Sequence, residues 1–260
     1  MKKADITRLV INADDFGLNQ PCTEAICEAF QKEFITDTTM VANGEAYLEA
    51  VDNIQKYNLQ NKIGIHFNLT EGVPITEDIK HCSMFCREGT FHGKVNRLKV
   101  LSRFEKRAVY QELNAQIARL EYDDICVTHA DSHHHIHTAI FIAPIVARVC
   151  KEHGIHKIRI HRNIGNIQGY KKVVKQLFNF WLKSKKFVTA KFFGSLKDVE
   201  GILETNMPRG VIEVMVHPEY NRDGVLIDKV TSNSEEAIGQ KLYSLKEIDE
   251  KIILSSYYEV

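Results

Sequence analysis

The sequence predicts an α/β protein with a mostly parallel β-sheet, and three observations lead to this prediction. Short β-branched segments alternate with longer amphipathic segments along the 260 residues, an order that indicates βαβ units. Polar and ionisable residues follow the ends of the strand-like segments. No linker or shift in composition divides the chain. We therefore expect one α/β domain over residues 1–260.

The expected strands are short β-branched runs or runs of alternating character. In the third, apolar residues alternate with Gly64, His66 and Asn68, which is typical of a half-buried strand. In the sixth, Glu213 and His217 share the face opposite three β-branched residues. The expected strands cover residues 9–13, 38–42, 62–69, 125–130, 157–161, 211–217 and 251–255.

The expected helices repeat apolar residues at spacings of three and four. Asn19 or Thr23 can cap the first, and Gly154 follows the fourth as a usual C-terminal residue. The fifth is amphipathic and rich in lysine. The expected helices cover residues 19–32, 45–57, 102–122, 138–153, 170–185 and 234–249.

Composition excludes several classes of protein. Hydrophobic residues make up 44% and charged residues 26%, which excludes a disordered chain, collagen or a coiled coil. Basic and acidic residues number 34 each, so a dedicated nucleic-acid or acidic-membrane binder is not favoured. The N-terminus lacks the pattern of a signal peptide, and the six cysteines show no CxxC spacing. We expect a soluble, cytoplasmic protein with free thiols.

Ionisable residues gather at the C-terminal ends of the expected strands. In parallel α/β folds, those ends carry the active site. One carboxylate with two or three histidines is also a normal set of ligands for a divalent cation. The residues concerned are Asp14, Asp15, His66, the histidine-rich run over 128–137, Arg159, His161 and His217.

Each of these motifs also has a purely structural interpretation. The two aspartates can form a turn that caps the next helix, and His66 can be a buried histidine with a satisfied hydrogen bond. The histidine-rich run can be a solvated loop. Their coincidence at one edge of the predicted sheet favours a functional site over these separate explanations.

Four segments resemble the YdjC-like carbohydrate deacetylase family, which includes chitooligosaccharide deacetylases. They read NADDFG at 12–17, GIHFNLT at 64–70, THADSHHHIH at 128–137 and EVMVHP at 213–218. The resemblance implies a distorted, TIM-like (β/α) barrel and hydrolysis of an acetamido group on an N-acetylated sugar or short oligosaccharide. It also implies one divalent metal ion, usually magnesium, with zinc or another cation as the alternatives.

The resemblance also assigns roles to individual residues. Asp15, His66 and His133 are the implied metal ligands, and Asp14 is the implied base. For the proton that the departing amine needs, His217 is the candidate donor. Arg159 and Glu213 are the candidate residues for orienting the sugar.

Two positions depart from the family pattern near the expected mouth of the site. The segment that begins at Arg159 lacks the proline that usually fixes this loop, and Glu219 replaces a frequent glycine after Pro218. These differences concern the identity of the sugar more than the metal site.

A long segment without predicted strands or helices, residues 70–97, follows the third strand. Loops of this length are often lids or binding loops. Phe91 within it is a candidate for stacking on a sugar ring. A plain surface excursion is the alternative.

Two other functions stay open from the sequence. The pair His135 and His137 is compatible with metal-assisted phosphoester hydrolysis. The whole set of motifs is also compatible with a metal- or sugar-binding protein that catalyses no reaction. An intact Asp14 argues against the second, because a binding protein needs no base. As partners we expect a small carbohydrate, no nucleic acid and no membrane, with a homodimer as one open oligomeric state.

Overall fold

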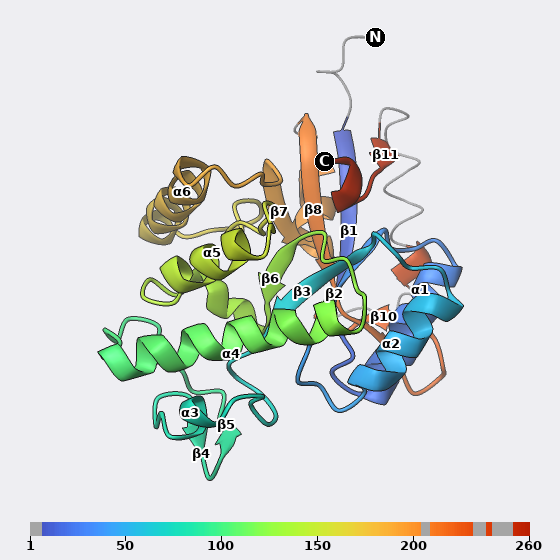
Figure 1. The fold of residues 1–260 in the computed structure, drawn as a ribbon. Coiled ribbons are helices and arrows are strands. Elements are labelled where there is room, and N and C mark those ends of the chain that lie inside the picture. Colours follow the sequence, from blue (N-terminus) through green and yellow to red (C-terminus); the bar gives the residue numbers. More distant parts are fainter. Residues whose placement is uncertain (1–6, 204–208, 231–237, 241–251) are drawn as a thin grey trace. The chain divides into compact units, whose positions relative to one another are not determined.

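The computed structural model describes residues 7–203, 209–230, 238–240 and 252–260 (Figure 1). Its strands are β1 (Thr7–Phe16), β2 (Asp37–Met40), β3 (Ile63–Phe67), β4 (Cys86–Arg87), β5 (Thr90–Phe91), β6 (Ala130–Ser132), β7 (Phe192–Ser195), β8 (Gly210–Val216), β9 (Pro218–Tyr220), β10 (Leu226–Asp228) and β11 (Ile252–Leu254). Its helices are α1 (Gln20–Gln31), α2 (Tyr47–Lys56), α3 (Glu77–Lys80), α4 (Arg103–Tyr122), α5 (Ala143–Glu152), α6 (Gly169–Ser184) and α7 (Leu196–Leu203), with 3-10 turns η2 (His133–Thr138) and η3 (Tyr257–Glu259).

The main sheet has the strand order β6-β3-β2-β1-β8-β7, with β11 also paired to β1. The pairs β1·β8, β1·β11, β7·β8 and β3·β6 are all parallel. Helices separate the successive strands of this sheet in the chain. This arrangement confirms the predicted α/β class with mostly parallel strands. None of the described helices combines the length and apolar character that a bilayer crossing requires.

The chain folds into two compact units. The first comprises Met1–Asp14, Pro21–Thr38 and Arg159–Val260, and the second comprises Asp15–Gln20 and Thr39–Ile158. The expectation of one domain over the whole chain stays a prediction.

The first unit is built on the pairing of β1 with β8. Seven consecutive residues of β1 pair with all of β8, and most residues of both strands are buried, as is usual for parallel strands inside a sheet. At the start of β1, β11 adds a short parallel pair, and Ser255 then donates its backbone N–H to the carbonyl of Leu9. The chain that follows β11 is thereby fixed beside β1.

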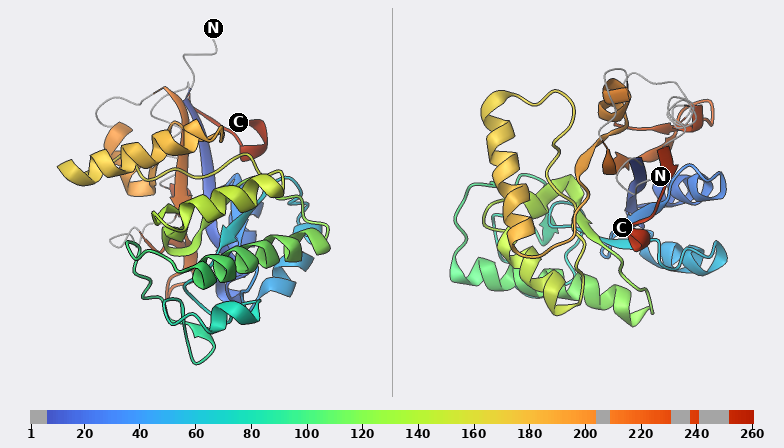
Figure 2. Two further views of the ribbon diagram at one scale, coloured as in Figure 1. Left: turned by 60° about the vertical axis from the view of Figure 1, so that its left-hand side comes forward. Right: turned by 90° about the horizontal axis from the view of Figure 1, so that it is seen from above.

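In the second unit, α4 positions the segment that follows β3. A capping box of Ser102 and Glu105 starts this helix. Its buried Gln116 exchanges two hydrogen bonds with the backbone of Asn68, and its buried Glu112 accepts from the backbone N–H of Thr76. Helix α5 packs beside α4 (Figure 2). The chain leaves β3 along a path that α4 fixes.

The long segment over 70–97 contains α3 and the β4·β5 hairpin, where sequence analysis expected only loop. The hairpin is two residues per strand and turns at Gly89, whose φ of +80° is in the left-handed region. The ring of Phe91 is only 6% exposed. The segment is therefore a small folded excursion.

Two predicted strands were placed wrongly. The strand expected over 125–130 is displaced to β6, and the one expected over 157–161 is reduced to a single bridge between Ala130 and Ile158. The strand β6 ends at Ser132, because His134 and His135 in the turn η2 that follows adopt left-handed φ values of 50° and 52°. Because of this turn, the next helix, α5, begins at Ala143 and not near residue 138. The helix expected over 234–249 lies outside the described residues except for 238–240, which are helical.

Candidate active site

Three side chains predicted as metal ligands meet within the second unit. Asp15 lies near the end of β1, His66 in β3, and His133 directly after β6. Asp15 has a φ of 74°, a left-handed conformation that is uncommon for a residue with a side chain. Strained backbone of this kind concentrates at functional sites. The structure thus brings together the three residues that sequence analysis singled out.

The geometry of these three residues is convergent. His133 Nδ1 lies 2.7 Å from Asp15 Oδ1, and His66 Nε2 lies 3.1 Å from the same oxygen. All three residues are buried, and one ligand atom from each lies within 4.8 Å of the others. One carboxylate oxygen and two imidazole nitrogens are a donor set that divalent transition metals accept. The residues present therefore fit a single divalent ion.

His66 is held from its other side by Asp131. His66 Nδ1 lies 2.6 Å from Asp131 Oδ1, and Thr39 donates its hydroxyl hydrogen to Asp131 Oδ2 at 3.1 Å. Such a carboxylate partner fixes the ring orientation and tautomer of a metal-binding histidine. Sequence analysis gave Asp131 no such role. The strand register that pairs His66 with Asp131 is the signal that reveals it.

The histidine-rich turn η2 presents His133 to this site. Arg97 donates hydrogen bonds to the backbone carbonyls of His134 and His135, which secures the two left-handed residues. The second ring nitrogen of His133, Nε2, lies 2.9 Å from Glu71 Oε2. Glu71 with His133 and His134 forms a second, more exposed group of potential ligands.

The carboxylates and histidines of this cluster shift one another's pKa values. Burial alone would raise the pKa of Asp15, but hydrogen bonds and charges of His133 and His66 hold it well below its usual value. Burial opposes protonation of His66, yet Asp131 and Asp15 raise its pKa. The pKa of His133 is also raised, because burial lowers it less than the hydrogen bond and the negative charge of Asp15 raise it. The carboxylates thus attract positive charge to the position where the ligand atoms converge.

The pair His135 and His137 does not join this arrangement. His137 Nδ1 lies 2.6 Å from the hydroxyl of Ser132, which also accepts the backbone N–H of His137. Neither histidine belongs to a described group of residues that could hold a metal. Phosphoester hydrolysis therefore stays an alternative drawn from the sequence alone.

A second cluster, within the first unit, surrounds Asp14. Arg159 donates two hydrogen bonds to its carboxylate, Nη1 to Oδ2 at 2.6 Å and Nη2 to Oδ1 at 2.7 Å. Arg159 Nε donates to Glu213 Oε1 at 2.6 Å, and the amide of Asn12 donates to Asp14 Oδ1 at 2.9 Å. The side chains of Arg159 and Glu213 are fully buried. Asp14 is consequently fixed in orientation by a two-pronged ion pair.

Tyr257, which sequence analysis missed, completes this cluster. Its hydroxyl donates to Glu213 Oε2, and its backbone N–H donates to Asp37 Oδ1 at 2.9 Å. The side chain is buried, and η3 carries it directly after β11. No local sequence pattern marks Tyr257, because its partners lie far from it in the chain.

His217, the predicted proton donor, directly follows β8. Its Nε2 lies 3.9 Å from Asp14 Oδ2, and its Nδ1 lies 4.0 Å from Asp228 Oδ1. Its backbone N–H donates to Asp228 Oδ1 at 2.9 Å. The side chain is 20% exposed, so the imidazole is partly accessible.

The three residues expected to contact the sugar occupy buried positions. Arg159 and Glu213 pair with each other, and Phe91 lies inside the excursion over 70–97. These locations favour a positioning role for Arg159 and Glu213. A contact between Phe91 and a sugar would require the excursion to rearrange.

Comparison with known proteins assigns this chain to a family. A family model described as YdjC-like protein matches residues 8–251. A carbohydrate deacetylase of Clostridium beijerinckii is 30% identical over 235 residues, which cover 88% of this chain and 86% of that protein. A carbohydrate deacetylase of Xenopus laevis is 35% identical over 162 residues, 61% of this chain, so the match spans about half, 52%, of that relative's length.

A solved structure shows a similar fold. It is a candidate cellobiose-phosphate cleavage protein of Enterococcus faecalis, with a TM-score of 0.70 and 22% identity over 97% of this chain and 98% of that one. At this identity the likeness concerns the fold alone. The resemblance drawn from four sequence segments is thus confirmed across most of the chain.

Proposed function

Because this chain belongs to the family of YdjC-like proteins, we propose that it is a metal-dependent deacetylase of an N-acetylated sugar. The substrate class is a monosaccharide or a short oligosaccharide of the chitooligosaccharide type. The reaction cleaves the C–N bond of an acetamido group with water and releases acetate and the free amine. Curated relatives named carbohydrate deacetylases support the choice of reaction.

The observation that carries this proposal is the convergence of two imidazoles on one carboxylate oxygen. Asp15, His66 and His133 would hold the divalent ion, and Asp131 would keep His66 oriented. When bound, the ion polarises the amide carbonyl and lowers the pKa of a water molecule. The family resemblance implies magnesium, whereas two nitrogen ligands are also suited to zinc and related metals. The metal that restores activity decides between them.

We assign the proton transfers to Asp14 and His217. The carboxylate of Asp14 accepts the proton of the attacking water, and its pair with Arg159 keeps both oxygens in one orientation. His217 donates a proton to the nitrogen of the departing amine, and its partial exposure suits a group that meets a substrate. Arg159 and Glu213 act as positioning residues, since they touch Asp14 or each other from buried positions.

The cellular setting follows from the thiols. All six cysteines are free, and four of them are buried. Free thiols are typical of a reducing compartment. We therefore propose that the reaction takes place in the cytoplasm.

The test is acetate release from a panel of N-acetylated mono- and disaccharides. The protein is first stripped with a chelator and then assayed after addition of magnesium, zinc, manganese or cobalt. We expect activity on at least one N-acetylated sugar, lost on chelation and restored by one of these metals. Equal acetate release from the stripped and the loaded protein would contradict the metal requirement. Phosphate release from a sugar phosphate without any acetate release would contradict deacetylation itself.

A further inference from the structure

The helix α6 exposes an apolar stripe. Its spacings of three and four residues place the stripe on one face of the helix, opposite the buried Asn179 and Leu182. Of the seventeen large apolar residues exposed in the described part of the chain, five belong to this helix. They are Tyr170, Val173, Val174, Leu177 and Phe180, between 56% and 73% exposed. Single exposed apolar residues are ordinary, but an aligned set of five marks an interaction surface.

The charge around the stripe is of one sign. Between Glu152 and Asp198 the sequence holds nine lysines and two arginines and no aspartate or glutamate, although the whole chain has a formal net charge of zero. On the helical projection, exposed Lys171 lies on one side of the stripe, and exposed Lys172 and Lys183 lie on the other. Lysines with long aliphatic stems can keep their ammonium groups at the edge of an apolar surface.

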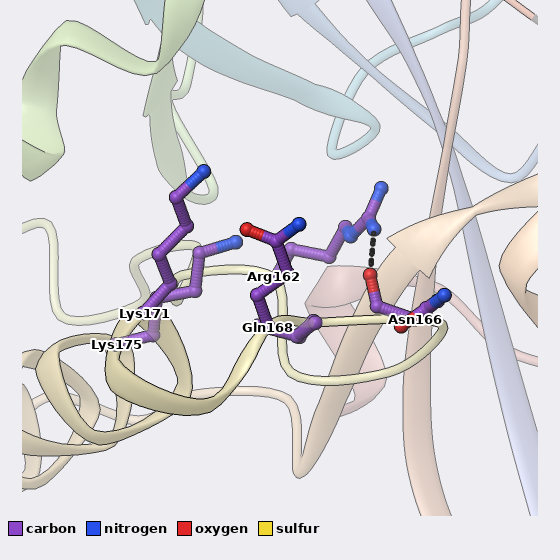
Figure 3. A pocket seen from close by; sticks show the side chains of 6 residues that line it. Arg162, Asn166, Gln168, Lys171 and Lys175 are labelled. Atoms are coloured by element: carbon purple, nitrogen blue, oxygen red, sulfur yellow. Dashed lines mark hydrogen bonds between the residues drawn. The ribbon is translucent and has the colours of Figure 1, made fainter.

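A basic pocket at the start of α6 extends this positive surface (Figure 3). Lys171, Lys175 and Arg162 line a cavity of about 300 Å³. Asp198 Oδ2 lies 3.4 Å from Arg162 Nη1, and its negative charge offsets part of the positive charge around the pocket. Burial, together with the charges of Arg162 and Lys171, nevertheless lowers the pKa of Lys175. An anionic surface near this end of the helix would relieve the repulsion among these groups.

We propose that α6 docks this protein on a bilayer that contains anionic lipids, with the helix lying flat in the headgroup region. The apolar stripe enters the interface, and the flanking lysines meet lipid phosphates, as in other basic amphipathic helices. The charge favours this occupant over a second copy of the chain, because two copies joined through α6 would bring together two lysine-rich segments that contain no carboxylate. A membrane partner differs from the expectation drawn from the sequence, which was that the protein has none. It does not depend on the proposed deacetylation.

The sequence supplies a reporter for this contact. Trp181 is the only tryptophan of the chain and lies within α6, next to Phe180. The full chain is mixed with phosphatidylcholine vesicles with or without phosphatidylglycerol. We expect co-sedimentation and a blue shift of the Trp181 emission only with phosphatidylglycerol, both reduced by added salt.

Matched variants separate the two components of binding. Leu177→Gln should weaken vesicle binding about tenfold or more, since it removes a leucine from the interface. Lys172→Gln together with Lys183→Gln should weaken it by an order of magnitude or more, at about fivefold per lysine. The controls are Leu48→Gln, a leucine of α2 that is 68% exposed, and Lys106→Gln, an exposed lysine of α4, and both should bind like the wild type.

Three results would overturn the proposal. One is the absence of vesicle binding, and another is equal binding to both vesicle types. The third is a lipid-free dimer that Leu177→Gln converts to a monomer without any vesicle binding, which would identify a second copy as the occupant. Sedimentation velocity on the same preparations, with circular dichroism to show that each variant is folded, distinguishes these results.

Discussion

The two clusters around the consecutive residues Asp14 and Asp15 are built on different principles. The cluster of Asp15 pairs carboxylates with histidines, whose protons can be exchanged for a metal ion. The cluster of Asp14 pairs carboxylates with an arginine, which keeps its charge at every accessible pH. The first is therefore suited to binding a cation, and the second to fixing a carboxylate in place. One peptide bond separates the proposed metal ligand from the proposed base.

The largest expected effect comes from Asp14→Asn. The amide keeps the shape of the side chain but cannot accept a proton as a base, so turnover should fall about 10²–10⁴-fold while the metal content is unchanged. Acetate release and elemental analysis of the same preparation measure the two quantities. If Asp14→Asn loses the metal, Asp14 is a ligand and the division between the two aspartates is wrong.

Arg159→Met tests how far the Asp14 cluster depends on its central cation. Removal of the guanidinium leaves the carboxylates of Asp14 and Glu213 buried without their charge partner, which should cost about 3–5 kcal/mol of unfolding free energy. Urea denaturation measures it. The matched control is Arg148→Met, because the pair of Arg148 with Glu152 is exposed and its loss should cost far less unfolding free energy. An equal loss of unfolding free energy in both variants would show that the buried pairs of Arg159 stabilise the fold no more than the exposed pair does.

Asp131→Asn tests the cluster of Asp15, the proposed metal site. The change weakens the support of His66 without removing a proposed ligand, so metal affinity should fall about 10–100-fold. Titration of the stripped protein with the activating metal measures this affinity. Asp78→Asn, at an exposed ion pair with Arg107, is the control. An unchanged affinity in Asp131→Asn would mean that Asp131 does not orient His66.

The smallest expected effect is that of Tyr257→Phe, which deletes one hydroxyl that donates to Glu213. We expect a kcat loss of about tenfold or less at unchanged KM and metal content, in keeping with about 1 kcal/mol for a buried hydrogen bond. Tyr122→Phe, at a residue that is 87% exposed, should leave kcat unchanged. In the Glu213→Gln background, Tyr257→Phe should cause little further loss, because the contact is already altered. Additive losses would place Tyr257 outside the Asp14 cluster.

The sequence predicted the cluster of Asp15 better than the cluster of Asp14, for a physical reason. The alternation along β3 identifies the face of His66, and a parallel sheet brings strand ends together, so ionisable residues could be expected at one edge of the sheet, while the family resemblance implied Asp15, His66 and His133 as the ligands. The role of Asp131 depends on the register between β3 and β6, which the alternation does not fix.

Burial also changed the interpretation of two residues that sequence analysis selected. Glu213 lies on β8 as expected and Arg159 follows the bridge at Ile158, but sequence alone did not show that each would be the partner of the other. Tyr257 was missed altogether, because β11 returns the chain to β1 from more than two hundred residues away. The turn at His134 and His135 was missed because left-handed backbone at histidine has no strong sequence marker.

The position of Tyr257 has a consequence for the order in which the protein matures during synthesis. Asp14, Asp37, Arg159 and Glu213 all precede Tyr257 in the chain, so the pairs of Arg159 with Asp14 and Glu213 can form before the hydroxyl of Tyr257 reaches them. Until β11 pairs with the start of β1, Glu213 lacks this donor. The proposed base can therefore gain this last support only after Tyr257 has been synthesised and has left the ribosome.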